Sequence, residues 1–231
     1  MIYFSIEKEH WQLTVDVTSE VEKKSSGQMQ LQVYRNAGLE EVKRQIAHLK
    51  GGADIKQYIF ETPMTASNAD ITAFARLSFR PGMSVFESAE DLTRRIYEGF
   101  EFRPGYTTIS TPLSQVFRDR KGVCQDFAHL AISCLRSVGL PARYVSGYLE
   151  TVSPVGFEKL LGSDASHAWF SIYIPDTGWT DFDPTNNCLV TDQHITIGWG
   201  RDYADIAPLE GIISSSGSHE LSVSVDVKRI L

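Results

Sequence analysis

The chain has three cysteines, and one of them stands where a nucleophile would be expected. The stretch RKGVCQDFAHL, residues 120–130, places Cys124 at the predicted start of a helix, among polar residues and beside Gly122. Unpaired amide N–H groups and the positive end of the helix dipole favour a thiolate at such a position. Cys134 lies among apolar residues of the same predicted helix, and Cys188 lies in loop-like sequence. Cys124 is therefore the candidate nucleophile.

A nucleophilic cysteine needs a neighbouring base, and the six histidines are the candidates. His129 follows Cys124 by five residues on the predicted helix, so it points about 140° away from the thiol. His167 starts a predicted strand and shares a face with Trp169, a flat apolar wall for an imidazole. Four others lie in the N-terminal third or in loop-like sequence: His10, His48, His194 and His219. We therefore expect His167 to be the base.

A carboxylate that would orient the imidazole is expected on the neighbouring strand. A PDTG turn folds residues 179–184 back alongside residues 166–174. Antiparallel pairing brings Asp181 and Asp183, which point to the same face, within a few residues of His167. The residues alone leave the register open, so either carboxylate is a candidate. Two acids on one face are also compatible with an exposed strand.

Two helices are predicted around these residues. Ser84 and Glu87 have the spacing of a capping box at the start of a helix that ends at Gly99. The second helix begins at Cys124, carries apolar side chains at helical spacing, and stops at Gly139. The second helix is the one that would present the nucleophile.

Strands are predicted on both sides of the helices. Strict alternation of apolar and polar residues predicts half-buried strands at residues 11–17 and 221–227. Residues 142–150, 166–174 and 179–184 are also predicted to be strands. Because helices precede an antiparallel sheet, the expected fold class is α+β.

The composition is that of a soluble globular protein of 231 residues with a net charge of −7. Clustered Lys and Arg are missing, so we expect no nucleic acid partner. No stretch is apolar enough for a signal peptide or a membrane span, so no membrane association is expected. Three widely spaced cysteines make no disulfide framework, and a reduced, cytoplasmic location is the expectation. The oligomeric state is left open.

Three blocks of sequence resemble the bacterial transglutaminase-like family, a branch of the papain-like cysteine enzymes. They are GVCQDFAHLAISCLRSVGLPARYVSGYL, DASHAWFSIYIPDTGWTDFDPTN and GRDYADIAPLEGI, in that order, and the resemblance runs from about Thr108 to the C-terminus. It implies a Cys-His-Asp triad, which falls by motif on Cys124, His167 and Asp183. The resemblance thus selects Asp183 over Asp181.

The resemblance also implies a fold and a domain division. Residues 69–231 would form a papain-like or transglutaminase-like core, with the helix-borne cysteine packed on an antiparallel sheet and a C-terminal strand. Residues 1–68 would form a partial N-terminal β-rich domain, because members of the family usually carry a longer one.

Several residues are candidates for supporting roles around the triad. The backbone N–H of Cys124 is one expected donor to an oxyanion, and Tyr106 is a candidate for a second. Asp126 and Trp169 are candidates for bracing the site. Each of these three side chains is equally compatible with a packing role.

The residues and the resemblance together predict thiol-dependent hydrolysis, or transamidation, of peptide or isopeptide amides through an acyl-enzyme. The substrate would be a protein or peptide, and hydrolysis is the preferred outcome. The alternative is an inactive scaffold of the same fold that binds peptides. No C-x-x-C or H-x-x-x-H spacing supports a metal site built from Cys124, His129, His167 or Cys188, so we expect no metal or other cofactor.

Overall fold

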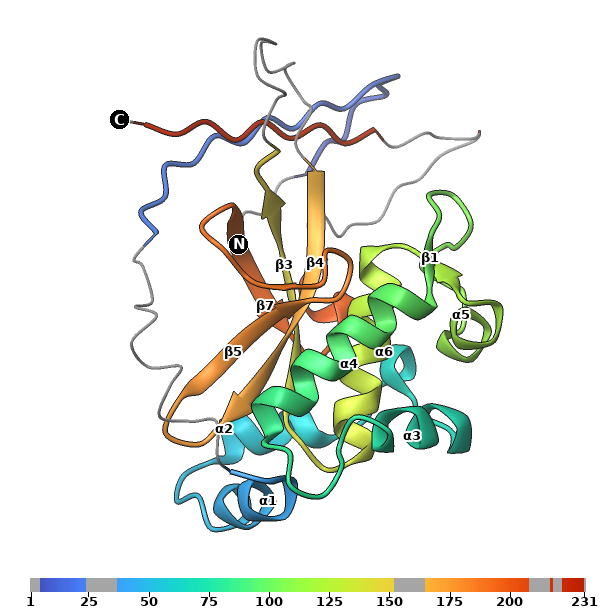
Figure 1. Ribbon diagram of the computed structural model, residues 1–231. Coiled ribbons are helices and arrows are strands. Elements are labelled where there is room, and N and C mark those ends of the chain that lie inside the picture. The colour runs from blue at the N-terminus through green and yellow to red at the C-terminus, as the bar shows by residue number, and fades with distance from the viewer. Residues whose placement is uncertain (1–4, 24–36, 152–164, 208–216, 218–221, 231) are drawn as a thin grey trace, which may run out of the picture.

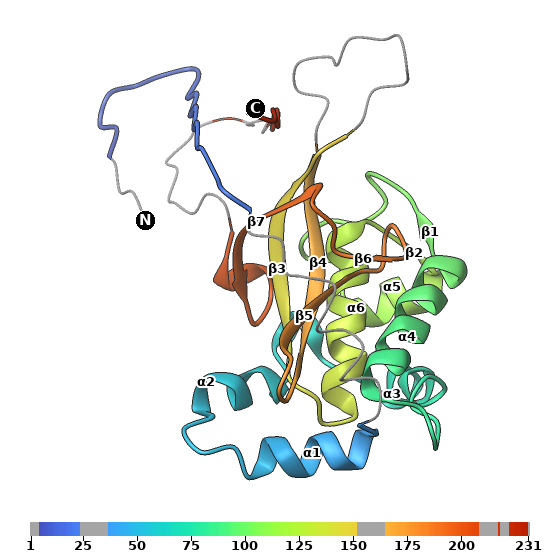
Figure 2. The ribbon, with the colours of Figure 1, turned by 60° about the vertical axis from the view of Figure 1, so that its left-hand side comes forward.

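The computed structural model describes residues 5–23, 37–151, 165–207, 217 and 222–230. It confirms the predicted class, because helices are combined with a five-stranded antiparallel sheet (Figure 1). The second view shows helices α4, α5 and α6 gathered on one side of that sheet (Figure 2).

The helices precede most of the sheet along the chain. They are α1 (Leu39–Ala47), α2 (Ala53–Lys56), α3 (Ala69–Arg76), α4 (Val85–Gly99), α5 (Leu113–Asp119) and α6 (Cys124–Ser137). Three short 3-10 turns accompany them: η2 (Gln57–Ile59), η3 (Pro63–Thr65) and η4 (Tyr203–Asp205). Two short strands, β1 (Glu101–Phe102) and β2 (Lys121–Gly122), pair in parallel just before α6.

The main sheet has the order β6-β5-β4-β3-β7, and its neighbouring strands are antiparallel. Its strands are β3 (Ala142–Leu149), β4 (Ala165–Ile174), β5 (Gly178–Asp183), β6 (Cys188–Leu189) and β7 (His194–Gly200). The hairpin of β4 and β5 places Ser171 opposite Asp181 and Phe170 opposite Phe182.

Helix α6 is the central element of the core. Its side chains are buried from Asp126 to Arg136, and Phe127 and Leu130 are almost fully enclosed. The opposing sheet face contributes Phe170 and Phe182, whose rings stack with their centroids 5.5 Å apart. This packing holds α6 against the sheet and so sets the position of its first residue, Cys124, relative to the strands.

The predicted elements nearest the site are confirmed. Helix α4 begins as expected: Ser84 caps the backbone N–H of Glu87, and the Glu87 carboxylate accepts from the backbone N–H of Ser84 at 2.9 Å. Helix α6 begins at Cys124, and Gly139 follows it with φ +86°, a conformation that favours glycine. The three predicted strands of the second half are β3, β4 and β5.

The two terminal strands predicted from alternation are not formed as predicted. Residues 11–17 make no strand, and Trp11 and Val17 are highly exposed. Of the described residues near the C-terminus, Val225 makes an isolated bridge. Alternation predicts a strand only where a sheet edge supplies hydrogen-bonding partners, and the described part of the chain supplies no such edge to residues 11–17.

The segment predicted to be β-rich before residue 69 is helical where the structure describes it beyond residue 37. Helices α1 and α2 lie there, and Val42 and Ile46 of α1 are buried in the same core as α6. These two helices lie before residue 69, and α1 shares the hydrophobic core of the residues that follow. The division of the chain at residue 68 stays a prediction.

Candidate active site

Cys124 is the first residue of α6, and the chain around it is held by Asp126. The Asp126 carboxylate accepts the backbone N–H of Val123 at 2.8 Å and the hydroxyl of Thr107 at 2.6 Å. A Cβ at position 122 would lie 2.8 Å from the Asp126 side chain, which explains why a glycine stands there. Burial raises the pKa of Asp126, and these two hydrogen bonds partly offset that rise. Asp126 therefore braces the turn that presents Cys124.

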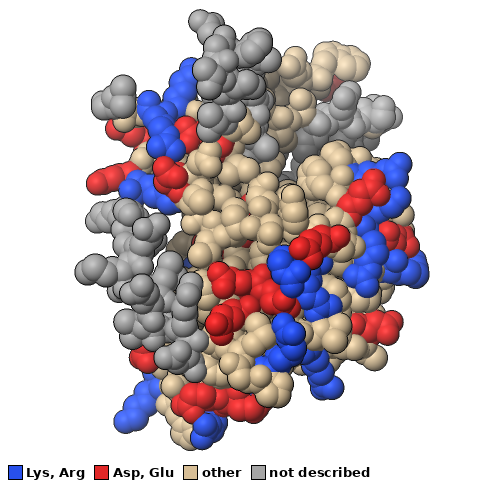
Figure 3. Space-filling view, in the orientation of Figure 1, with Lys and Arg blue, Asp and Glu red and all other residues tan. Residues whose placement is uncertain are grey.

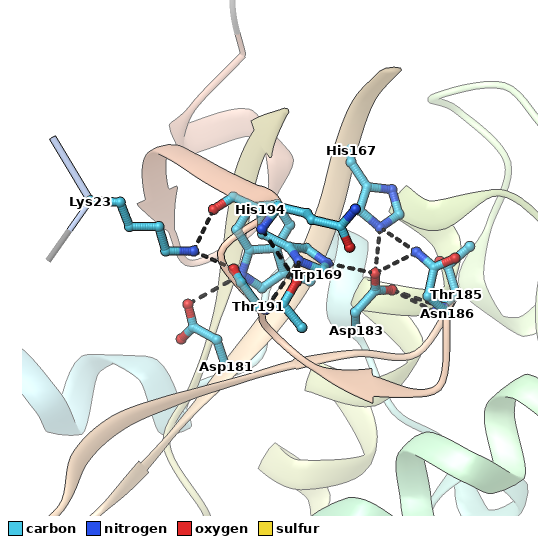
Figure 4. Close-up of polar contacts among 10 residues, drawn as sticks. Lys23, His167, Trp169, Asp181, Asp183, Thr185, Asn186, Thr191 and His194 are labelled. Carbon is cyan, nitrogen blue, oxygen red and sulfur yellow. Dashed lines mark hydrogen bonds and ion pairs between the residues drawn. The ribbon is translucent and has the colours of Figure 1, made fainter. Parts of the chain in front are cut away.

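His167 and Asp183 meet on the sheet beside this helix start. The Nε2 atom of His167 lies 2.7 Å from Oδ2 of Asp183, and both side chains are buried (Figure 4). His167 comes from the start of β4 and Asp183 from the end of β5, so the hairpin register brings them together. The Cys124 side chain also helps to raise the pKa of His167, so the thiol lies within the electrostatic reach of the imidazole. Since Nε2 is engaged by Asp183, the other ring nitrogen, Nδ1, is the one left for the thiol.

Asp181 has a different partner. It accepts the indole N–H of Trp169 at 3.2 Å (Figure 4). Trp169 is fully buried, and its ring lies 6.1 Å from that of His167. The structure thus brings Asp183, and not Asp181, to the imidazole, and it places Trp169 beneath His167 as a packed and hydrogen-bonded side chain.

The electrostatics of the pair favour a charged imidazole. Burial alone would lower the pKa of His167, but the hydrogen bonds to Asp183 and Cys124 outweigh it and raise that pKa to about 9. Burial alone would raise the pKa of Asp183, but the hydrogen bonds from His167 and His194 hold it well below its ordinary value. His167 therefore carries its proton at neutral pH, and loses it as the pH rises through about 9.

Asp183 receives more donors than the imidazole alone. Its Oδ1 accepts the backbone N–H groups of Thr185 at 2.8 Å and Asn186 at 3.1 Å. Its Oδ2 accepts the Asn186 side-chain amide at 2.6 Å and lies 3.0 Å from Nε2 of His194. The DPTN turn thus wraps the carboxylate, which fixes its orientation as well as its charge.

The sequence did not assign Asn186 or His194 to the site. Asn186 lies within the recognised DPTN motif, but nothing in its type showed that it folds back on Asp183. His194 was expected in loop-like sequence; it is the first residue of β7 and is buried. The alternation of polar and apolar residues in HITI was the signal that could have placed it on a strand.

The other candidate side chains lie elsewhere. The ring of His129 stacks on Tyr144 with centroids 4.9 Å apart, and its Nε2 accepts the backbone N–H of Tyr203 at 3.2 Å. Burial lowers the pKa of His129 to about 4, so it is neutral. Tyr106 is exposed, and its hydroxyl donates to Asp119 at 3.0 Å.

The two remaining cysteines have unreactive surroundings. Cys134 is fully buried, and burial raises its pKa to about 12. Cys188 lies on β6, where burial and the charge of Asp183 raise its pKa to about 11. At neutral pH both are almost entirely in the thiol form.

The surface adds two observations on partners. On the face shown in Figure 3, Lys and Arg are interspersed with Asp and Glu. Among the helices in the described ranges, none has the length and apolar character needed to cross a membrane.

Comparison with known proteins gives several relatives of this chain. A protein of Mycobacterium tuberculosis with no assigned function is 49% identical over 162 residues, which make up 68% of this chain and 52% of that protein. The chain thus spans about half the length of such curated relatives. The protein-glutamine gamma-glutamyltransferase of Pseudomonas aeruginosa is 30% identical over 102 residues, 41% of this chain and 15% of that protein.

One solved structure and one family model also match this chain. A structure described as a candidate cysteine protease from Cytophaga hutchinsonii has a TM-score of 0.58 and 30% identity, and covers 70% of this chain and 51% of that one. The model of the transglutaminase-like superfamily matches residues 72–184, a range that holds Cys124, His167 and Asp183. Residues 72–184 are therefore a domain of the transglutaminase-like superfamily.

Proposed function

We propose that this chain is a thiol-dependent amidase in which Cys124 is the nucleophile, His167 transfers protons and Asp183 orients His167. The observation that supports this most is the hydrogen bond between Nε2 of His167 and Asp183 at 2.7 Å, made by an imidazole whose pKa the Cys124 side chain also raises. One related structure is described as a cysteine protease and one relative is named a protein-glutamine gamma-glutamyltransferase; both kinds of enzyme transfer an acyl group from an amide, so we propose a protein or peptide substrate.

The first half-reaction forms a thioester. The Cys124 thiolate attacks the amide carbon, a C–S bond forms, and the carbonyl π electrons move to oxygen. The backbone N–H of Cys124, at the N-terminus of α6, is a suitable donor to that oxyanion. As the C–N bond breaks, the His167 imidazolium gives its proton to the leaving amine. Neutral His167 and an acyl-Cys124 remain.

The second half-reaction depends on the acceptor. Water gives one proton to neutral His167 and its oxygen attacks the thioester carbon. The C–S bond breaks, which releases a carboxylic acid and restores the thiolate and imidazolium, and the acid then loses its proton to solvent. A primary amine would follow the same steps and yield a new amide. In both cases Asp183 keeps the ring oriented and stabilises its charged form.

Hydrolysis is the acceptor reaction that we propose. A transamidase must keep water from the thioester, and Trp169, on the same strand face as His167, is the residue that could shield it. Trp169 instead lies in the sheet face: it is fully buried and its indole N–H is bonded to Asp181. That position removes the main reason to expect a shielded thioester. The stretch 153–166 precedes His167 along the chain and is a candidate for one wall of the cleft, but most of it lies outside the described residues.

The test is to follow the acyl-enzyme with and without a competing amine. A glutamine-containing peptide and a simple peptide amide serve as acyl donors, and Cys124→Ala serves as the control that forms no thioester. We expect deacylation to be indifferent to added primary amine and to yield the free carboxylate. Deacylation that speeds up with amine and gives the amide adduct would instead identify a transamidase. A peptide that binds without any acyl-enzyme would identify an inactive scaffold.

A further inference from the structure

A second histidine, His194, contacts the triad carboxylate. It is the first residue of β7, is 3% exposed, and places Nε2 at 3.0 Å from Oδ2 of Asp183 (Figure 4). The imidazole of His167 occupies another side of the same oxygen, and the two histidine rings lie 6.0 Å apart. Asp183 is therefore held between two imidazoles from strands that are not neighbours in the sheet.

The hydrogen bonds of His194 determine which of its nitrogens carries the proton. Its Nδ1 lies 3.2 Å from the backbone N of Thr191, and a backbone N–H can only donate. Nδ1 must therefore be the acceptor, which leaves the proton of the neutral ring on Nε2, pointing at Asp183. The Thr191 hydroxyl, also 3.2 Å from Nδ1, adds a second contact at the same nitrogen.

The same argument weighs against a metal ion at this cluster. The ligand atoms of His167, Asp183 and His194 lie within 4.8 Å of one another, close enough to share an ion. A metal on Nε2 of His194 would need the lone pair there and would move the ring proton to Nδ1, against the Thr191 N–H. A hydrogen bond from His194 to Asp183 satisfies every one of these atoms and needs no ion.

Gly147 leaves room for the Trp169 ring, which packs against both histidines. It lies on β3, the strand between β4 and β7, opposite His167 on one side and Thr196 on the other. A Cβ there would lie 2.5 Å from the Trp169 ring, so the missing side chain lets that ring lie across β3. His194 packs edge-on against the same indole, with ring centroids 5.3 Å apart. The indole thus supports both histidines.

The turn that carries His194 is also tethered. Lys23 donates its ammonium group to the backbone carbonyl of Thr191 and, at 2.8 Å, to that of His194. Burial lowers the pKa of Lys23, while the charges of Asp192 and Asp181 oppose that change. The position of His194 is thus fixed by its backbone, by its Nδ1 contact and by its ring packing, none of which involves Asp183.

We propose that His194 is a positioning residue for the triad: it donates Nε2–H to Asp183 and so fixes the carboxylate that orients His167. The inference rests on the proposed function of Cys124, His167 and Asp183. Without His194, Oδ2 of Asp183 keeps the donors of His167 and Asn186 and loses the one that comes from β7. The carboxylate then has room to turn, and His167 loses its fixed direction toward Cys124.

The test compares three variants by the rate at which iodoacetamide alkylates Cys124, which needs no known substrate. His194→Phe keeps a flat ring of similar size and removes the donor. His194→Gln keeps an N–H donor near the position of Nε2. Leu189→Ala, in β6 of the same region, loosens packing and leaves His194 in place. Hydrogen bonds to charged groups are worth about 1.5–3 kcal/mol, so we expect His194→Phe to slow alkylation about tenfold to a hundredfold.

The expected pattern is a slow His194→Phe, a recovery of most of the rate in His194→Gln, and a near wild-type rate in Leu189→Ala at matched stability. Equal rates for His194→Phe and the wild type would overturn the inference, as would a Gln variant as slow as the Phe variant. So would a Leu189→Ala variant that is slowed as much as His194→Phe. If wild-type Cys124 is itself unreactive, the proposed function fails, whatever the variants do.

A measurement on the unmodified chain guards against a variant that fails to fold. Long-range ¹H–¹⁵N NMR of the histidine rings reports which nitrogen is protonated. We expect a neutral His194 with its proton on Nε2. A His194 protonated on Nδ1 alone would contradict the inference without reference to any substitution.

Discussion

Replacing Asp183 with Asn is expected to lower turnover by a factor of about 10³–10⁴, the scale seen when a triad carboxylate is made an amide. The Asp183 carboxylate is an acceptor for five N–H donors: His167, His194, the Asn186 side chain and two backbone amides. An amide offers one oxygen in place of two and turns an NH₂ group toward some of those donors. His167 then loses both the charge that stabilises its protonated form and the hydrogen bond that directs it toward Cys124.

The matched control is Asp181→Asn. Asp181 lies two residues earlier on the same strand and face, and its carboxylate accepts the Trp169 indole N–H at 3.2 Å, as an Asn oxygen can also do. We expect turnover within about threefold of the wild type, because this substitution keeps a neutral hydrogen bond remote from the imidazole. Steady-state rates on a peptide substrate, with folding checked by circular dichroism, make the comparison. A larger loss in Asp181→Asn than in Asp183→Asn would show that the carboxylates have been assigned the wrong way round.

The largest effect on stability is expected from Gly147→Ala. A Cβ on Gly147 would lie 2.1 Å from the carbonyl oxygen of Ile195 and 2.5 Å from the Trp169 ring. The oxygen belongs to the backbone of β7 and the ring is fully buried, so neither can move cheaply. Overpacking of this kind costs about 1–3 kcal/mol and occasionally more. We expect a loss of about 3 kcal/mol, and a melting temperature lower by about 6–12 °C.

Gly198→Ala is the control for this prediction. Gly198 also lies in the sheet, on β7, but a Cβ there would meet only a methyl group of Ile206, at an ordinary contact distance of 3.8 Å. Its effect should stay below about 1 kcal/mol. Thermal unfolding followed by circular dichroism compares the two. Equal melting temperatures for the two variants would mean that the close approach of β7 and Trp169 to Gly147 is not as described.

The elements that carry the triad could be predicted from the sequence because their signals are local. The capping box at Ser84, the apolar periodicity after Cys124 and the alternation around His167 each depend on a few neighbouring residues. The β4–β5 hairpin was also predictable, because a PDTG turn leaves few ways to fold the chain back. The choice of Asp183 over Asp181 was different: the residues left the register open, and only the resemblance selected Asp183.

The rest of the site depends on contacts that no local pattern contains. His194 reaches Asp183 only because β7 joins the sheet beside β3 and because Gly147 leaves room between them. Residues 11–17 do alternate between apolar and polar side chains, but a strand also needs a neighbouring strand to pair with. Whether such a strand is present is a property of the assembled sheet. The hydrogen bond from the Asn186 side chain to Asp183 depends on the three-dimensional path of the DPTN turn, which the sequence does not give.

The central claim is that Cys124 is a reactive thiolate paired with His167, and alkylation of the folded protein tests it most directly. Iodoacetamide is added at neutral pH, and the modified peptides are mapped by mass spectrometry over time. Cys134 and Cys188 have pKa values raised to about 12 and about 11 by burial, so few of their thiols are ionised. We predict that Cys124 is alkylated at least about a hundredfold faster than either. Equal rates at all three cysteines, or a faster reaction at Cys188, would contradict the assignment of Cys124 as the nucleophile.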